Sequence, residues 1–77
     1  MNPILVAKNI ISKSLFIPVE KIPDNGSLND IQPMDSLSFE GLVIGIEQAV
    51  GHEVDIMELL ELRSVEDVVN VLKRNGL

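Results

Sequence analysis

Apolar residues recur at helical spacing through most of this 77-residue chain, and that periodicity restricts it to a helical fold. Asn2 can cap a first helix whose first position is Pro3, where the missing N–H removes no hydrogen bond. The helix is expected to end at Ile17-Pro18, because the residue before a proline avoids the α region.

Residues 17–34 are predicted to form a long connection, since they hold three of the four prolines and the turn sequence Asp24-Asn25-Gly26-Ser27. Long loops in small domains are either functional or fixed by their own apolar side chains. The candidates for fixing this one are Val19, Ile22, Leu28 and Ile31.

A second helix is predicted to begin near Asp35-Ser36, either of which can serve as its N-cap, and to end at Gly51-His52. The spacing of its apolar residues predicts one buried stripe. That stripe consists of Phe39, Leu42, Val43, Ile46 and Val50.

Two further helices are predicted from capping-box spacing: a short one of about two turns opening at Asp55, and a last one opening at Ser64. The inner face of the last helix is predicted to be Val65, Val68, Val69 and Leu72. Lys73 and Arg74 complement its C-terminal dipole, and Gly76 can close it. The sequence therefore predicts one all-α domain over residues 1–77, a four-helix bundle with a short third helix and a long loop between the first two.

The charge balance excludes several partners. Twelve acidic and six basic residues give a net charge of −6, which disfavours nucleic acid and anionic membrane surfaces. Residues 30–67 hold ten acids against the single Arg63, an asymmetry that favours a partner with a basic surface, although a merely solubilising surface is the alternative. No apolar run is long enough for a membrane span and no targeting segment is evident, so we expect no stable membrane insertion and a cytoplasmic location.

The residue types needed for catalysis are scarce. The chain has no cysteine, hence no disulfide and no thiolate metal site. Its one histidine, His52, is expected in a loop, and neither a phosphate-binding glycine pattern nor a calcium-loop spacing occurs. We therefore predict no catalytic residues, no metal site and no enzyme activity.

Ser36 is the residue best placed to carry chemistry. At the start of a helix its hydroxyl is expected to be exposed beside unpaired backbone N–H groups and the positive end of the helix dipole. That setting favours an anion bonded to the serine oxygen, such as a phosphodiester.

The chain resembles acyl carrier proteins over essentially its whole length. The resemblance rests on Asp35-Ser36-Leu37 and on residues 42–47, 53–54 and 64–68, together with the loop stretch 22–28. It implies that Ser36 carries 4′-phosphopantetheine, transferred from coenzyme A by a phosphopantetheinyl transferase that uses magnesium. An acyl chain would then be carried on the added thiol as a thioester, and aliphatic side chains could shelter it.

The resemblance also implies a monomer whose second helix docks acyl-loading and acyl-processing enzymes through their basic patches. The residues in or near that predicted docking surface are Asp35, Leu37, Glu40, Gly41, Ile44 and Glu47. The expected pathways are fatty acid, polyketide or related lipid biosynthesis.

Two departures from the family pattern favour a specialised carrier. Pro33 and Met34 replace the glycine that usually precedes the Asp-Ser pair, and Gly41 and Gly45 lie on one predicted face of the second helix where they could admit a partner closely. An aminoacyl or peptidyl carrier remains an alternative, as does an unmodified helical interaction module with the same fold.

Overall fold

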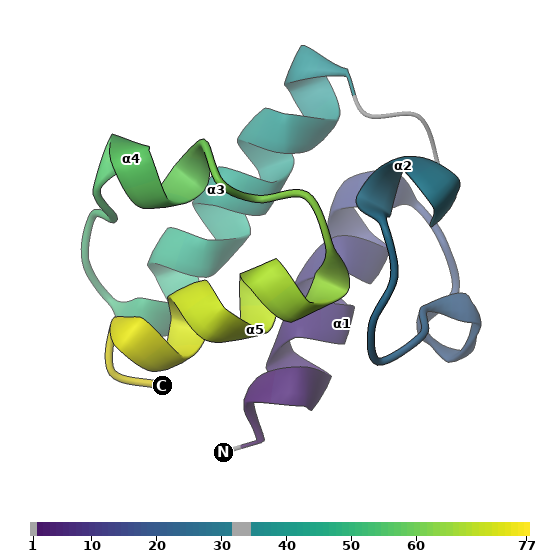
Figure 1. The fold of residues 1–77 in the computed structure, drawn as a ribbon, viewed down its shortest axis with the longest axis horizontal. Coiled ribbons are helices and arrows are strands. Elements are labelled where there is room, and N and C mark those ends of the chain that lie inside the picture. Colours follow the sequence, from purple (N-terminus) through teal and green to yellow (C-terminus); the bar gives the residue numbers. More distant parts are fainter. Residues whose placement is uncertain (1, 32–34) are drawn as a thin grey trace.

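The computed structural model describes residues 2–31 and 35–77, all of whose regular elements are helical (Figure 1). The elements are α1 (Pro3–Leu15), the 3₁₀-helix η1 (Val19–Lys21), α2 (Leu28–Ile31), α3 (Ser36–Val50), α4 (Ile56–Leu59) and α5 (Val65–Arg74). The predicted all-α class is confirmed, with three major helices and three short ones in this part of the chain.

Helix α1 begins as the sequence predicts. The Asn2 side chain accepts a hydrogen bond from the Ile4 N–H at 2.9 Å, and Pro3 occupies the first helical position. The helix ends at Phe16, whose φ of 58° places a bulky residue in the left-handed region that glycine usually occupies at this position.

The predicted long connection contains η1 and α2, which the sequence analysis missed. Ile22 and Leu28 fix it as predicted, each only 2% exposed, and Ile31 packs against the core. Val19 does not, because it lies exposed on η1.

A backbone bridge ties this connection to the segment before α5. The Leu28 N–H donates to the Arg63 carbonyl at 2.9 Å, and the Val65 N–H donates to the Gly26 carbonyl at 3.0 Å. The two bonds keep α2 next to the start of α5, although the two segments lie far apart in the sequence (Figure 1).

Asp35, not Ser36, caps helix α3. Its Oδ1 accepts from the Ser38 N–H at 2.7 Å, which makes Ser36 the first helical residue. Leu42 and Ile46 are fully buried, and the rest of the predicted stripe is partly buried against the core. Gly51 ends the helix at a φ of 82°, as predicted.

Helix α4 is shorter than predicted, a single turn of four residues. Asp55 caps it through the Met57 N–H at 2.9 Å, but Glu58 does not complete the predicted capping box. The Glu58 carboxylate turns instead to α5, where it pairs with Arg74 at 3.2 Å and accepts from the Asn75 side chain at 3.3 Å.

Helix α5 has the predicted capping box. The Ser64 hydroxyl accepts from the Asp67 N–H at 3.1 Å, and the Asp67 carboxylate accepts from the Ser64 N–H at 3.1 Å. All four predicted inner-face residues are buried, and Val71 joins them. Gly76 closes the helix as predicted, directly after the C-cap Asn75 and at a φ of 101°. The Gly76 N–H donates to the Lys73 carbonyl at 3.3 Å and the Leu77 N–H donates to the Leu72 carbonyl at 3.0 Å, while the Asn75 side chain donates to the Val71 carbonyl at 2.8 Å.

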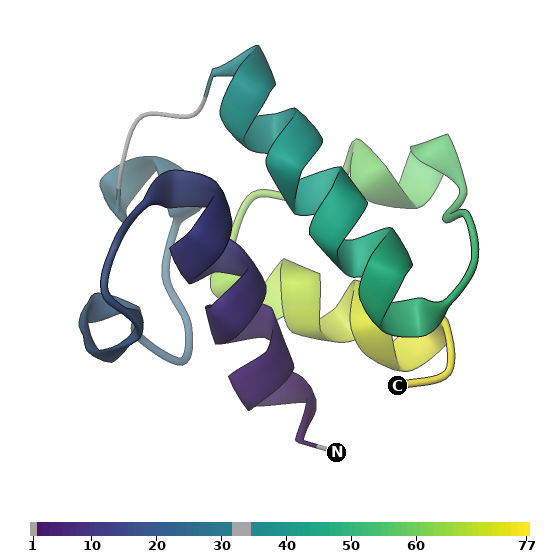
Figure 2. The same ribbon diagram turned by 180° about the vertical axis from the view of Figure 1, so that it is seen from behind.

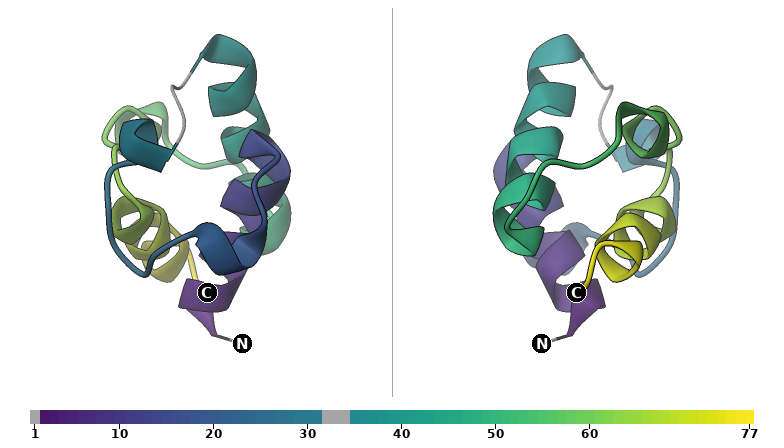
Figure 3. Two further views of the ribbon diagram at one scale, coloured as in Figure 1. Left: turned by 90° about the vertical axis from the view of Figure 1, so that its right-hand side faces the viewer. Right: turned by 90° about the vertical axis from the view of Figure 1, so that its left-hand side faces the viewer.

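The three long helices enclose an aliphatic core. Helix α1 packs against both α3 and α5, and Figures 2 and 3 show α1 and α3 on one side with α5 and α2 on the other. The core residues are Ala7, Ile10, Ile11, Leu15, Ile22, Leu28, Leu42, Ile46, Val54, Leu59, Leu62, Val65, Val68, Val69, Val71 and Leu72. Neither phenylalanine is among them, so aliphatic side chains, all branched except Ala7, fill the most buried volume.

Candidate functional site

Ser36 lies on the surface at the end of α3 that projects beyond the rest of the molecule (Figure 1). It is the first residue of the helix and is exposed. Within residues 2–31 and 35–77, no hydrogen bond engages its hydroxyl. The oxygen is therefore free to be modified, and no base among the described residues is hydrogen-bonded to it.

The neighbouring carboxylate is already occupied. Asp35 accepts hydrogen bonds from the Ser38 N–H and the Ser38 hydroxyl, and these bonds lower the pKa of Asp35 below its usual value. Asp35 is consequently ionised at neutral pH and fixes the first turn of α3. It positions Ser36 without acting on it.

Some of the predicted docking residues on α3 form an exposed stripe along the helix. Leu37 is 77% exposed, and Glu40 and Ile44 follow it at three- and four-residue spacing on the same face. Glu47 is only partly exposed, because its Oε2 accepts from the Val54 N–H at 2.9 Å. The Glu47 carboxylate thus fixes the segment that leads to α4.

The two glycines of α3 face α1. A Cβ atom added at Gly45 would lie 2.8 Å from Cγ2 of Ile10, and one added at Gly41 would lie 3.5 Å from Cβ of Ser14. Gly45 is therefore not on a fully exposed face as expected, although both glycines line a groove of about 470 Å³ between α1 and α3, and a docking role for Gly41 stays a prediction. The missing side chain at Gly45 permits close packing of α3 on α1 within the molecule.

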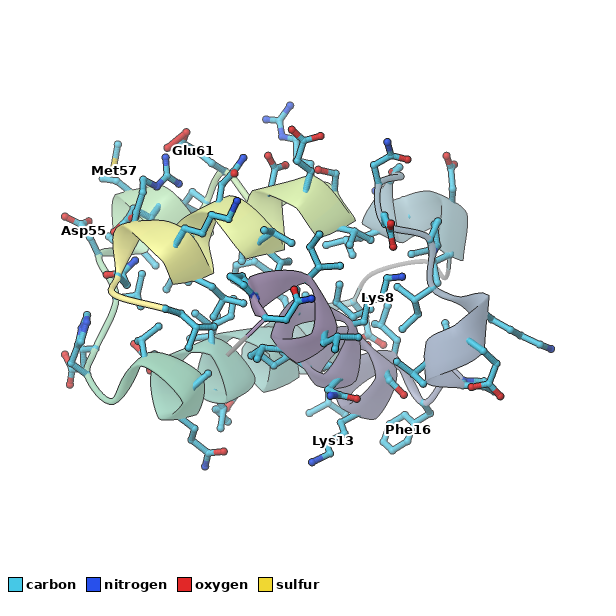
Figure 4. All side chains as sticks on the ribbon, turned by 90° about the horizontal axis from the view of Figure 1, so that it is seen from below. Lys8, Lys13, Phe16, Asp55, Met57 and Glu61 are labelled. Carbon is cyan, nitrogen blue, oxygen red and sulfur yellow. The ribbon has the colours of Figure 1, made fainter. Side chains whose placement is uncertain are left out.

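A second exposed apolar patch, on α4, was not among the predicted site residues. It consists of Ile56, Met57 and Leu60, all at least 60% exposed. Figure 4 shows Met57 between Asp55 and Glu61 on the outer side of the molecule. Helix α4 has a single turn and buries only one side chain, Leu59, which leaves its other apolar side chains exposed. The signal for this patch in the sequence was the close spacing of apolar residues within an acidic stretch.

His52 has a structural position. Its Nδ1 lies 2.8 Å from the Glu53 carbonyl oxygen and its Nε2 lies 3.3 Å from the Asn75 carbonyl oxygen. The two carbonyls, and to a lesser degree the charges of Glu47 and Glu58, raise the pKa of His52 above its usual value. The ring links the start of the 51–55 segment to the end of α5.

Other kinds of site are not found in the described residues. No group of three or more metal-ligating side chains gathers there. No helix among them is long and apolar enough to span a membrane.

The site thus consists of an exposed serine hydroxyl at the start of a helix, on a small helical domain. Comparison with known proteins identifies the class. Residues 6–72 match the family described as the phosphopantetheine attachment site. The chain belongs to this family of phosphopantetheine-dependent carrier proteins, whose members are carriers and not enzymes.

Two curated relatives agree with that assignment. The chain is 33% identical to an acyl carrier protein of Buchnera aphidicola subsp. Schizaphis graminum over 69 residues, covering 90% of this chain and 87% of the relative. It is 29% identical to an acyl carrier protein of Coprothermobacter proteolyticus over 68 residues, covering 88% and 83%. The predicted resemblance is confirmed at the level of the family. The departures at Pro33 and Met34 lie outside the residues that the structure describes.

The residues present fit the cofactor of this family. Phosphopantetheine needs one accessible hydroxyl for a phosphodiester, and Ser36 offers a hydroxyl that is exposed and unbonded in the described part of the chain. The positive end of the α3 dipole lies beside it and favours a negative charge there. When bound, the group supplies the thiol that this chain lacks.

Proposed function

We propose that this protein is an acyl carrier and that Ser36 is the residue to which 4′-phosphopantetheine is attached. The observation that carries the proposal is the exposed Ser36 hydroxyl at the start of α3, inside the segment matched by the family. Both curated relatives are named acyl carrier proteins, which supports acyl cargo over aminoacyl or peptidyl cargo.

Each residue around Ser36 has a definable task in this proposal. The Ser36 oxygen forms the ester bond to phosphate, with loss of the pyrophosphate-linked adenosine portion of coenzyme A, after a phosphopantetheinyl transferase removes its proton, because no base among residues 2–31 and 35–77 is hydrogen-bonded to it. Asp35 holds the first turn in place through Ser38. The positive end of the α3 dipole favours the phosphate charge.

We infer that partner enzymes dock on the exposed face of α3, through Asp35, Leu37, Glu40 and Ile44. A mixed surface of this kind suits the phosphopantetheinyl transferase and the acyl-loading and acyl-processing enzymes, each with a basic rim around an apolar patch. Gly41 and Glu47, also predicted for this surface, contribute less, because one contacts α1 and the other binds the Val54 N–H.

The expected role is the delivery of acyl intermediates to enzymes of fatty acid, polyketide or related lipid biosynthesis, with this chain serving a specialised set of partners. The aliphatic core supports acyl cargo, because branched apolar side chains can separate around a hydrocarbon chain without losing polar contacts. In the competing hypothesis the chain is a helical interaction module that is never modified.

Modification can be tested by mass. The purified chain is incubated with a broad-specificity phosphopantetheinyl transferase, coenzyme A and magnesium, and its intact mass is compared before and after. We expect the gain of one phosphopantetheine group in the wild type and in Ser38→Ala, and no gain in Ser36→Ala. Equal gains in Ser36→Ala and the wild type would refute the Ser36 assignment, and no gain in any variant would favour the unmodified module.

A further inference from the structure

Asparagine is followed directly by glycine at two places in the chain, at Asn25-Gly26 and at Asn75-Gly76. In such a pair the glycine nitrogen can attack the side-chain carbonyl of the asparagine, because glycine has no Cβ to obstruct the approach. The reaction needs an accessible asparagine side chain and a glycine N–H that is free to lose its proton. The two pairs of this chain differ in both respects.

The first pair lies in the connection between η1 and α2. Asn25 and Gly26 are both exposed, and within residues 2–31 and 35–77 neither the Asn25 side chain nor the Gly26 N–H forms a hydrogen bond. The groups around them are held, because Lys8 pairs with Asp24 and the Gly26 carbonyl accepts from the Val65 N–H at 3.0 Å. The two reacting groups are therefore accessible within an anchored turn.

The turn itself requires glycine at position 26. Gly26 has a φ of 141°, a conformation that residues with a Cβ rarely adopt. A Cβ added there would also lie only 3.2 Å from Cγ of Pro23. Since the backbone fixes the glycine, the residue that precedes it decides whether this turn is chemically labile.

The second pair is held by hydrogen bonds and serves as an internal control. The Asn75 side chain donates to the Val71 carbonyl at 2.8 Å and to Oε1 of Glu58 at 3.3 Å, and the Gly76 N–H donates to the Lys73 carbonyl at 3.3 Å. These bonds must break before the glycine nitrogen can lose its proton and reach the side-chain carbonyl. That local opening costs free energy, which slows the reaction at Asn75.

We propose that Asn25 is a site of spontaneous deamidation. The Gly26 nitrogen gives its proton to solvent base and forms a bond to Cγ of Asn25, while the bond from Cγ to the side-chain nitrogen breaks and that nitrogen leaves as ammonia. Water then opens the cyclic imide. Attack of water on Cγ yields aspartate, and attack on the main-chain carbonyl carbon of residue 25 yields isoaspartate.

The two products differ in their effect on the connection. Isoaspartate adds one carbon atom to the main chain directly before Gly26, whose carbonyl bonds to the Val65 N–H. Aspartate keeps the length of the main chain and adds only a negative charge. We therefore expect isoaspartate, and not aspartate, to weaken the bridge that ties this connection to the start of α5.

The test ages the purified full chain in mildly alkaline buffer, with and without urea. Peptide mapping by mass spectrometry measures the gain of one mass unit at each pair, and methylation by an isoaspartyl methyltransferase identifies isoaspartate. Asn25→Gln removes the reactive group, because the longer side chain must close a larger and less favourable ring, and Asn75→Gln is the matched control. Because the Asn25 side chain is exposed and forms no hydrogen bond among the described residues, Asn25→Gln is expected to keep the fold, which a thermal melt verifies.

Without urea we expect Asn25 to deamidate about tenfold faster than Asn75, and in urea the two rates become similar because both pairs are then unprotected. Asn25→Gln loses most of the mass gain of the native protein, and Asn75→Gln keeps it. A native rate at Asn75 that equals or exceeds the rate at Asn25 overturns the proposal. A rate ratio that is unchanged in urea also overturns it, because the sequence alone and not the fold would then select the site.

The effect on the bridge is measured on the isoaspartyl form, separated from the aged protein by chromatography, and on the variant Asn25→Asp. We expect the isoaspartyl form to unfold at a lower urea concentration than Asn25→Asp, which carries the same charge on an unaltered main chain. Equal midpoints of the two forms would overturn the proposed weakening of the bridge.

Discussion

Phe16 combines two unfavourable properties at one position. It is 90% exposed, and its φ of 58° lies in the left-handed region. Glycine occupies that region at helix C-termini without a steric penalty, whereas a residue with a Cβ does not. The side chain therefore contributes little burial in return for its backbone strain, which makes Phe16 informative to mutate.

Phe16→Gly is expected to raise the free energy of unfolding by about 0.5–1 kcal/mol, because relief of the left-handed backbone outweighs the small lost burial. The same change at Phe39, which is helical and partly buried in α3, is expected to lower it. Urea or thermal denaturation of both variants checks the prediction. A lower stability in Phe16→Gly would show that Phe16 packs on the surface more than its exposure indicates.

The two glycines of α3 differ in the space beside them, and the difference predicts opposite signs. Gly45→Ala places a methyl group 2.8 Å from Cγ2 of Ile10 and should destabilise by roughly 1–3 kcal/mol through overpacking between α1 and α3. Gly41→Ala meets Ser14 at an ordinary 3.5 Å and should stabilise by up to about 1 kcal/mol through helix propensity. Denaturant melts of the pair decide between these outcomes, and equal effects would contradict the described packing of α1 on α3.

The segment between α3 and α4 is held by side chains at both ends. Glu47 accepts from the Val54 N–H at 2.9 Å, while His52 lies between the carbonyls of Glu53 and Asn75. When the imidazole is protonated, both ring nitrogens donate, which explains why the pKa of His52 is raised. The link is thus strongest in the protonated form.

This link predicts a pH dependence of stability. Because the folded pKa of His52 lies above its unfolded value near 6.5, the contribution is fully present below pH 6.5 and is lost as pH rises through the folded pKa. The difference in melting temperature between the wild type and His52→Gln should therefore be larger at pH 6 than at about pH 8.5. Carboxylates titrate in a lower range and cancel in the difference. A difference that is independent of pH would refute the link.

The elements that the sequence predicted well are those with local signals. Asn2 with Pro3 placed the start of α1, and Ser64 with Asp67 placed the start of α5, because capping depends on neighbours within one turn. Helix α4 was predicted too long. The prediction used Glu58 as a local capping residue, but in the fold its carboxylate pairs with Arg74 and accepts a hydrogen bond from Asn75. The backbone bridge between residues 26–28 and 63–65 depends on contacts between distant segments, and no local pattern reports it.

The candidate site also combines features that local sequence signals predict with features that depend on tertiary packing. Ser36 is predicted from a short motif at a helix start, and the exposure of Leu37 and Ile44 follows from helical register. The register also placed Gly45 on a surface, yet α1 covers that face, because the choice of which helix packs on which stripe is made by the whole core. Tertiary packing therefore decides which part of α3 remains for a partner.

At the scale of the whole molecule, the acidic half extends beyond the face of α3. Ten of the twelve acids lie in residues 30–67, and several of them surround the exposed apolar patch of α4 formed by Ile56, Met57 and Leu60. Figure 4 shows Asp55 and Glu61 beside this patch, while Lys13 and Phe16 lie at a different part of the surface. A partner with a basic rim can therefore contact α3 and α4 together.

Charge reversal tests whether both helices take part in docking. Glu40→Lys on α3 and Glu61→Lys beside α4 should each lower kcat/KM of the phosphopantetheinyl transferase several-fold at low salt, mainly through slower association. The effect should shrink as ionic strength increases, since exposed charges are screened within about 10 Å at 0.1 M. Glu20→Lys on η1 is the matched control and should change little, because the same charge is reversed outside the proposed surface. A loss in Glu40→Lys without one in Glu61→Lys would confine docking to α3, and equal losses in all three would indicate that only net charge matters.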